Sequence, residues 1–575
     1  MAEIGSIGVG PVHTVSSNGG IEPLGSGPLV HWGVRADDRW HIARDERAVR
    51  QIVAEDGVSI ETRLRIPGGD IVHRASSTPY KNTSLVIVEI ENETPLPVAI
   101  AFFTAGSGIW RCEGNTLFRN NVSVISASKP VSHCQVAATE GELLGVLRLE
   151  ESQNDAERSQ PVKGSHVAIV FPLPHTSSLR LVFWVENKLH SLPNPDDLPN
   201  LEGIANGWNA HLDYGSSVEL ENEGVQKVLF TARRHLLVGC EQPLTSNYWL
   251  KGVPAYASAL AISSMCLWGH IEAAKRLLTK SIDQYQVSSF QRPEMEYLSY
   301  LLWACDEFTL HHMDDEVSVP ILNWAIDQIG NFVAAVPRSR IRRRIGHSYL
   351  RLGLESSVSL LKRSGHFEEA HQLENTLPKI YKNNSISLQS GSLPNALLDE
   401  DQSPTPIAKC LNHYLSDTEE SGSLSEIIGR AEPTGGFSSS ERLQDPFASA
   451  LFLLMFRRSL VSQPDSSTVA LFPGYTAKWF NVSVEVSNMP TTNGEVGYAV
   501  RWHGDRPALL WEGKVNSQIT FTSPGFDPTW GSNELRGEAL LPQQKPDEIA
   551  IPLISSPIQK PSITPSKPEK GNNFS

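Results

Sequence analysis

The hydrophobic pattern of the first 200 residues has a period of two, which indicates β-strands. Ser59–Pro67 and Ser84–Glu91 alternate apolar and polar positions, whereas Pro97–Ala105 and His166–Leu173 are short apolar runs bounded by turn residues. Alternation is typical of strands with one buried face, and short apolar runs fit strands that are buried on both faces. The segment 192–200 has three prolines and is interpreted as a linker. We therefore predict a two-sheet β-sandwich domain over residues 1–200.

From about residue 218 the apolar positions recur with the 3.6-residue period of an α-helix. Segments that are apolar on nearly every side, such as Pro254–Gly269, alternate with segments that have one apolar face, such as Ile271–Gln286. A double ring of helices produces this alternation, because its inner helices are buried all round and its outer helices on one side only. We predict an (α/α) toroid domain over residues 201–465. The predicted helices are Glu223–Cys240, Pro254–Gly269, Ile271–Gln286, Glu294–Leu310, Ser318–Val336, Gly353–Gly365, His366–Tyr381, Pro404–Ser416, Ser423–Ala431 and Asp445–Val461.

Strand patterns return after the last predicted helix. Trp479–Pro490 and Gly494–Gly504 alternate again, so we predict a small C-terminal β-domain over residues 466–542. Residues 543–575 are rich in Pro, Lys and Ser and have little apolar surface to bury, which predicts a disordered tail. The predicted fold class is thus multidomain α+β.

Charge and cysteine usage narrow the function classes. The 575 residues carry a net charge of -15, which argues against nucleic acid or an anionic membrane surface as a partner. The six cysteines form no CxxC pair, so we expect reduced thiols. The HEXXH, P-loop and GxGxxG motifs are missing, so we expect neither a metal ion nor another cofactor. The first residues lack the basic and apolar regions of a secretory signal, and we expect a cytoplasmic protein.

Four passages together resemble the six-hairpin glycosidases, the superfamily of glucoamylases and maltose phosphorylases. Glu223–Leu237 resembles their opening helix, and Tyr248–Leu278 resembles the segment with an aromatic loop, a buried helix and a "G, acidic, A, A" sequence. Asp445–Val461 resembles the closing helix, and Leu471–Trp502 resembles the C-terminal domain. The resemblance implies a helical toroid with a carbohydrate site in its central cavity.

The residues that the superfamily uses for catalysis are partly missing. The loop with the aromatic-Arg-Asp motif reads Trp249-Leu250-Lys251-Gly252 here. The loop expected to carry the general acid, Pro337–Arg351, contains no Asp or Glu. Inverting hydrolysis needs one carboxylic acid and one carboxylate base, so the sequence predicts weak or absent hydrolysis.

Other carboxylates remain candidates for the catalytic pair. Glu426 and Glu432 precede the last helix, where such enzymes often carry their base, although Glu426 is also an ordinary first-turn acid. Glu294 or Glu296 at a helix start would be the relocated acid, with the same ordinary alternative. The arginines between 338 and 344 form either an anion pocket or a solvated basic loop.

The candidate substrate-binding residues are Tyr248, Trp249 and Lys251 in the aromatic loop, together with Arg292. Trp268 and Trp303 lie within apolar helices and are interpreted as core residues. Three functions stay open: a carbohydrate- or glycoconjugate-binding protein with little hydrolysis, an active glycoside hydrolase or phosphorylase with relocated acids, and a non-catalytic interaction scaffold. The sequence leaves the oligomeric state open.

Overall fold

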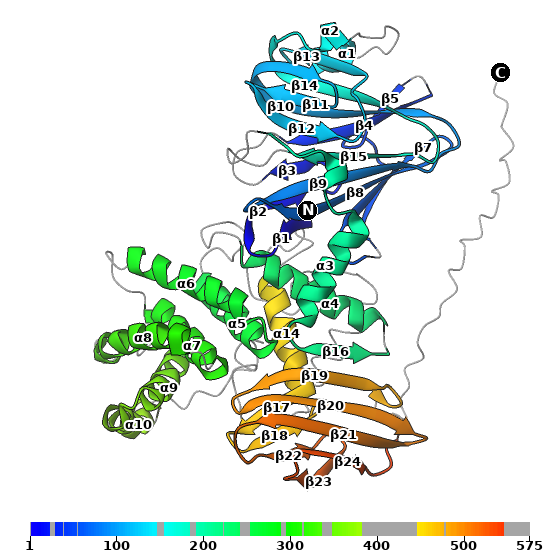
Figure 1. Cartoon of the computed structure of the whole chain (residues 1–575). Helices are drawn as coiled ribbons and strands as arrows, with labels where there is room; N and C mark the ends of the chain where they lie inside the picture. The colour runs from blue at the N-terminus through cyan, green and yellow to red at the C-terminus, as the bar shows by residue number, and fades with distance from the viewer. Residues whose placement is uncertain are drawn as a thin grey trace, which may run out of the picture.

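The computed structural model is a multidomain α+β structure in which a β-rich N-terminal region, a group of helices and two C-terminal sheets follow one another (Figure 1). The structure describes residues 2–23, 29–37, 39–54, 56–146, 155–183, 191–221, 223–241, 254–288, 295–312, 315–335, 348–381, 446–475 and 479–545.

The N-terminal region is a 15-stranded sheet whose pairings are all antiparallel. Along the main path the strand order is β1-β2-β3-β4-β10-β11-β12-β15-β9-β8-β7-β6, and β5, β13 and β14 pair to its side. The strands are β1 Ala2–Ser6, β2 Val9–Val15, β3 Ile21–Pro23, β4 Val30–Ala36, β5 Arg39–Ile42, β6 Val49–Val53, β7 Ile60–Ile66, β8 Gly69–Tyr80, β9 Thr83–Asn92, β10 Val98–Glu113, β11 Thr116–Arg119, β12 Val122–Ala127, β13 His133–Ala137, β14 Val162–Leu173 and β15 Ser178–Phe183.

The N-terminal strands form one continuous sheet, where the sequence predicts two sheets. Strand β10 makes this possible, because its first half pairs with β4 and its second half with β11. Its register against β14 shifts between Ala105 and Gly108, and Gly106 has a φ of 152°. Such an irregularity bends a strand and lets it continue in a new direction. The sheet therefore folds over on itself around a shared interior.

Both faces of the sheet are buried where β9 crosses the middle of it. Val86, Val88 and Ile90 face the interior that the folded sheet encloses. Leu85 and Ile87 point the other way and belong to the apolar core that continues into the helices. The alternation of β9 thus joins the N-terminal sheet to the helical region, with the side chains of successive residues entering different cores.

The described helices cover most of the segments that the sequence predicts as helical, while Pro404–Ser416 and Ser423–Ala431 lie outside the described residues. The helices are α1 Glu140–Val146, α2 Asp155–Arg158, α3 Leu201–Asp213, α4 Glu223–Gly239, α5 Pro254–Leu267, α6 Ile271–Ser288, α7 Met295–His311, α8 Asp315–Ala335, α9 Ser348–Arg363, α10 Phe367–Tyr381 and α14 Pro446–Leu460, with a short 3-10 helix η2 at Pro195–Asp197.

Helices α5 to α10 form an arc of inner and outer helices. The inner helices α5, α7 and α9 contact one another in succession, and α14 packs between α5 and α4. Helix α6 lies against α5 and α7, α8 against α7 and α9, and α10 against α9 (Figure 1). Every residue of α5 from Ala257 to Cys266 is buried. Closure of this arc into a ring depends on residues 382–445, which lie outside the described part of the chain.

Two small sheets follow α14. The order of the first is β16-β19-β20-β21-β24, and that of the second is β17-β18-β22-β23, where β18 and β22 are parallel. Their strands are β16 Ser217–Leu220, β17 Val461–Asp465, β18 Thr468–Leu471, β19 Val484–Thr491, β20 Gly494–His503, β21 Arg506–Val515, β22 Thr520–Ser523, β23 Asp527–Ser532 and β24 Arg536–Leu540.

Strand β16 comes from the range that the sequence predicts as helical, and it pairs with β19 from the C-terminal region. Gln544 belongs to the predicted tail, but its amide donates a hydrogen bond to the carbonyl of Asp505. The rest of the predicted tail, from residue 546 onward, lies outside the described residues. Within the part of the chain that the structure describes, no helix has the length and apolar character that spanning a membrane requires.

Candidate functional site

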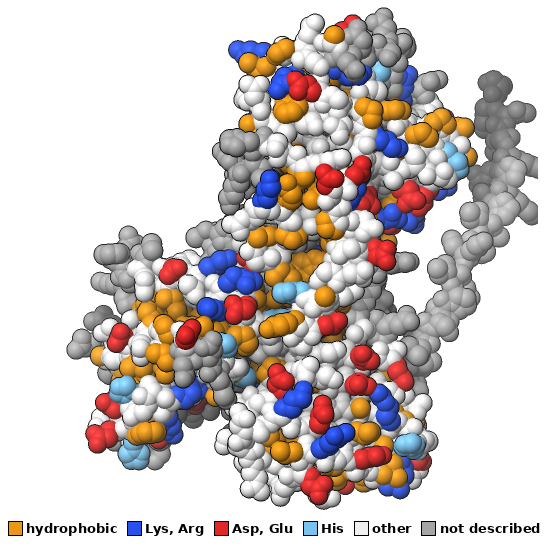
Figure 2. All heavy atoms as spheres, in the orientation of Figure 1, with side chains coloured by type: hydrophobic (Ala, Val, Ile, Leu, Met, Phe, Trp, Pro, Cys, Tyr) orange, Lys and Arg blue, Asp and Glu red, His pale blue; other side chains and the backbone are white. Residues whose placement is uncertain are grey.

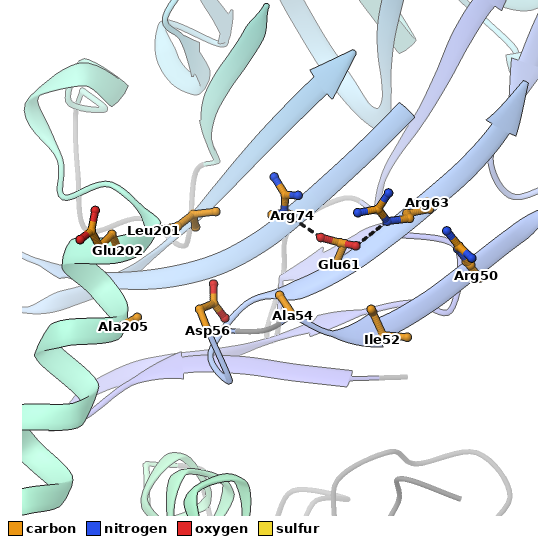
Figure 3. A pocket seen from close by; sticks show the side chains of 10 residues that line it. All are labelled: Arg50, Ile52, Ala54, Asp56, Glu61, Arg63, Arg74, Leu201, Glu202 and Ala205. Atoms are coloured by element: carbon orange, nitrogen blue, oxygen red, sulfur yellow. Dashed lines mark hydrogen bonds and ion pairs between the residues drawn. The ribbon is translucent and has the colours of Figure 1, made fainter. Parts of the chain in front are cut away.

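A groove of about 720 Å³ lies where the outer face of the N-terminal sheet meets helix α3. We call it the α3 groove, and Figure 3 shows its side chains pointing from β6, β7 and β8 on one side and from α3 on the other. Its lining residues are Arg50, Ile52, Ala54, Asp56, Glu61, Arg63, Arg74, Leu201, Glu202 and Ala205.

Helix α3 is held against the sheet by one apolar face. Ile204, Ala205, Trp208 and Leu212 are its buried residues, and their spacing places them on one side of a helix. The side chain of Asn200 caps the helix by accepting a hydrogen bond of 2.8 Å from the Gly203 amide. These contacts fix the start of α3, with Leu201 and Glu202, over the edge of the groove.

Glu61 is the centre of an ion-pair network in the groove. One of its oxygens accepts from Arg63 Nε at 2.6 Å and the other from Arg74 Nε at 2.8 Å. Each guanidinium group also binds a second carboxylate. Arg63 Nη1 donates to Glu93 and Arg74 Nη1 donates to Glu91, both at 2.9 Å. Burial alone would raise the pKa of Glu61, but the hydrogen bonds from Arg63 and Arg74 outweigh it and lower the pKa.

The charges that line the groove balance. Three arginines stand against Asp56, Glu61 and Glu202, so the formal charge of the lining is zero. Figure 2 likewise shows acidic and basic side chains interspersed over the face that it displays. Beside the charged groups lies an apolar strip that includes Ile52, whose side chain is 55% exposed. The groove therefore offers fixed donors and acceptors next to an apolar surface, with no excess of positive charge, because Glu91 and Glu93 add negative charge behind the arginines.

A second group of polar side chains lies among the inner helices. Glu307 of α7 accepts hydrogen bonds from Ser263 Oγ of α5 at 3.2 Å and from Trp303 Nε1 at 3.3 Å. Its neighbour Asp306 is only 14% exposed and forms an ion pair with Arg363 of α9. Burial raises the pKa of Asp306 to about 6, although Arg363 opposes the shift.

Replacing Asp306 with Asn is expected to change the pH dependence of stability. Because the folded-state pKa is raised, the contribution of Asp306 is fully present below pH 3.8 and is lost as the pH rises through 6. The free energy of unfolding of the wild type should therefore fall by about 3 kcal/mol relative to the Asn variant between pH 3.8 and pH 7. Urea unfolding followed by helix circular dichroism measures this difference. A difference that stays constant with pH would contradict the assignment.

The residues that the sequence predicts as site residues lie outside the described part of the chain. This holds for the predicted catalytic residues Glu426, Glu432 and Glu294, for the predicted binding residues Tyr248, Trp249, Lys251 and Arg292, and for the arginines between 338 and 344. The side chain of Glu296 is also outside it. These predictions stay predictions. Trp268 and Trp303 are 0% and 6% exposed, as expected of core residues.

Sequence reasoning did not find the α3 groove. The signal in the sequence was the alternation of Glu61, Arg63 and Arg65 on one face of a strand, which ordinarily indicates a solvated surface. Arg74 becomes the partner of Glu61 only through the register of β7 against β8, which places the two residues opposite each other. No three His, Cys, Asp or Glu side chains of the described residues gather in a group that could hold a metal ion.

No protein-family model matches this chain, and no curated protein matches it. Among solved structures, the chain is similar to a bacterial glucoamylase complexed with acarbose, with a TM-score of 0.42 and 9% sequence identity over 64% of this chain. The match spans 64% of the length of the glucoamylase. A polysaccharide lyase gives a TM-score of 0.19 and 11% identity over 74% of this chain and 80% of the lyase. Both TM-scores lie below 0.5, which is too weak a likeness to assign a function.

Proposed function

We propose that this protein binds a neutral carbohydrate, or the sugar part of a glycoconjugate, in the α3 groove. The observation that carries the proposal is the composition of the lining, where three arginines are matched by three carboxylates and leave no excess of positive charge. A phosphate or polyanion site would need an excess of guanidinium groups, because a carboxylate repels an anion. A neutral ligand rich in hydroxyl groups meets no such repulsion.

The arrangement of polar and apolar groups fits the two faces of a sugar ring. A sugar hydroxyl both donates and accepts hydrogen bonds, so a carboxylate and a guanidinium group side by side suit neighbouring hydroxyls. The C–H groups of the ring need an apolar surface, and Ile52, Ala54 and Leu201 supply one in the groove. Because Glu61, Arg63 and Arg74 already hold one another, binding would immobilise few additional side chains.

The resemblance to six-hairpin glycosidases agrees with this ligand class and extends the proposal. We infer that the inner and outer helices close into a toroid, which the succession of α5 to α10 supports. We also infer that hydrolysis is weak or absent, because Pro337–Arg351 contains no carboxylate. Product analysis with any oligosaccharide that binds would test this, and rapid cleavage would show that other acids have taken over the catalytic roles.

A thermal-shift panel of the full chain tests the ligand class. Neutral oligosaccharides, sugar phosphates, acidic oligosaccharides and inorganic phosphate would be compared at equal concentration. A neutral oligosaccharide at a hundred times its dissociation constant should stabilise the protein by about 2.7 kcal/mol, and phosphate should give no shift. Stabilisation by phosphate or acidic sugars alone would contradict the charge argument, and a flat panel would remove the carbohydrate proposal.

Replacing Ile52 with Ala should weaken binding of the selected oligosaccharide about tenfold, because a sugar ring would lose part of its apolar contact surface. The 55% exposure of Ile52 means that the fold itself should lose little stability. Isothermal titration calorimetry measures the dissociation constant. The matched control is Ile109→Ala, since Ile109 also lies on a strand, is 50% exposed and is absent from the groove lining. Equal affinities in both variants would place the ligand elsewhere.

A further inference from the structure

Two cysteines of the N-terminal sheet approach each other in its interior. Cys112 lies near the end of β10, is 1% exposed and belongs to the enclosed apolar core. Cys134 lies on β13 and packs against the same core while keeping part of its surface accessible. Cys134 is opposite Ile169, and Ile169 is opposite Phe102 of β10, so the three side chains share one face of the sheet. Strand β10 contacts β13, and the segment Arg158-Ser159 touches both: Ser159 Oγ donates to the Cys112 carbonyl at 3.3 Å, and Arg158 donates to the carbonyl of Ser132 just before β13.

The two thiol groups interact with each other, and this interaction is the largest influence on both: it lowers the pKa of the Cys112 thiol and raises that of Cys134. The guanidinium group of Arg158 favours the thiolate further, and it is held in place by donating to the carbonyl of Ser132 at 2.9 Å.

The other described cysteines have different surroundings. Cys240, Cys266 and Cys305 are buried among the helices, and burial raises the pKa of each, to about 12 for Cys240. Cys240 Sγ is 3.1 Å from Met265 Sδ, which cannot form a disulfide. A thiol that stays protonated in an apolar interior reacts slowly with oxidants. Cys240, Cys266 and Cys305 can therefore serve as unreactive controls within the same chain.

We propose that Cys112 and Cys134 form a redox-active pair that closes to a disulfide when the protein meets a hydroperoxide and reopens when a dithiol reduces it. The Cys112 thiolate attacks one peroxide oxygen, the O–O bond breaks, and a sulfenic acid and hydroxide result. The sulfur of Cys134 then attacks the sulfenyl sulfur, the S–S bond forms, and the S–O bond breaks with release of a second hydroxide. The two thiol protons convert both hydroxides to water, so two thiols and hydrogen peroxide give one disulfide and two water molecules.

The disulfide would have a structural consequence for one edge of the N-terminal sheet. Strand β13 pairs with β14 and, among the described strands, with no other, and helix α1 packs on both. A disulfide from β13 to the end of β10 would attach β13 to a second strand, in addition to its pairing with β14. Oxidation should therefore slow the local opening of β13 and α1 without changing the α3 groove.

The test uses the full chain treated with a stoichiometric amount of hydrogen peroxide, followed by alkylation and peptide mapping. We expect a loss of two hydrogens in intact mass and a linked peptide pair that contains Cys112 and Cys134, while Cys240, Cys266 and Cys305 are alkylated after unfolding. Dithiothreitol should restore both thiols. Hydrogen exchange of peptides from β13 and α1 should be slower by at least tenfold in the oxidised protein.

The Cys134→Ser variant separates the proposed pair from independent oxidation. In this variant Cys112 should stop at the sulfenic acid, which dimedone traps, and no linked peptide should form. Cys112→Ser should abolish both the trapped species and the link. Oxidation of the wild type to sulfinic acids without a link, or a link that involves one of the three helical cysteines, would overturn the proposal.

Discussion

Replacing Trp268 with Ala should lower the free energy of unfolding of the helical region by about 4 kcal/mol, near the upper end of the effects measured for buried aromatic residues. The side chain is 0% exposed, and its indole N–H donates to the Leu453 carbonyl of α14 at 3.0 Å. Its ring lies parallel to Phe456, with 6.5 Å between the ring centroids, and the Arg233 guanidinium lies 5.2 Å from its centroid. The Ala variant would lose these contacts with α4 and α14, which pack the end of α5 against both helices.

The measurement is urea unfolding followed by circular dichroism at 222 nm, with Trp268→Phe and Trp530→Ala as companions. The Phe variant keeps most of the ring contact but loses the indole donor, so its loss should be about half as large. Trp530 is half-buried on β23 and packs against Trp511 with 5.1 Å between centroids, so its removal should cost clearly less. A loss below about 2 kcal/mol for Trp268→Ala would mean that the surrounding helices collapse into the space.

The sequence predicts best those elements whose own hydrophobic pattern determines which of their faces are buried. Pro254–Gly269 has no polar face, and α5 is indeed buried on every side. Ile271–Gln286 has one apolar face, and α6 packs with that face on α5 and α7. In both cases the number of buried faces follows from the pattern, because a helix without a polar side can be covered only by neighbours all round.

Features that depend on residues far apart in the chain could not be predicted from the sequence. The single folded sheet depends on where β10 bends, and in the sequence the glycines at 106 and 108 indicate only that a bend is tolerated there. Strand β16 is four residues long and is stabilised by β19, which lies more than 260 residues further along the chain. The α3 groove needs the register of β7 and β8 together with a helix from another region. The candidate site predicted from the sequence lies outside the described residues, so it stays untested by the structure.

The N-terminal sheet contains two histidines that are buried in the neutral form. His13 of β2 is 0% exposed, and its Nε2 bonds to the Ser84 carbonyl at 3.3 Å. His73 of β8 is 1% exposed and stacks on Trp32 with 5.1 Å between the ring centroids. Among the described residues, Nδ1 of each ring has no hydrogen-bond partner. Burial lowers the pKa of His13 to about 4 and that of His73 to about 3.

The N-terminal sheet should therefore lose about 4 kcal/mol of stability between pH 7 and pH 5, roughly half of it from each histidine. A lowered pKa means that the stabilising contribution is present above pH 6.5 and is lost as the pH falls, since the unfolded chain takes up the proton first. Hydrogen exchange of peptides from β2 and β8 follows this loss directly. The His73→Phe variant keeps an aromatic ring against Trp32 but cannot be protonated, so the loss between pH 7 and pH 5 should shrink to about 2 kcal/mol. If the variant and the wild type lose the same stability over this interval, the acid sensitivity of the sheet comes from groups other than His73.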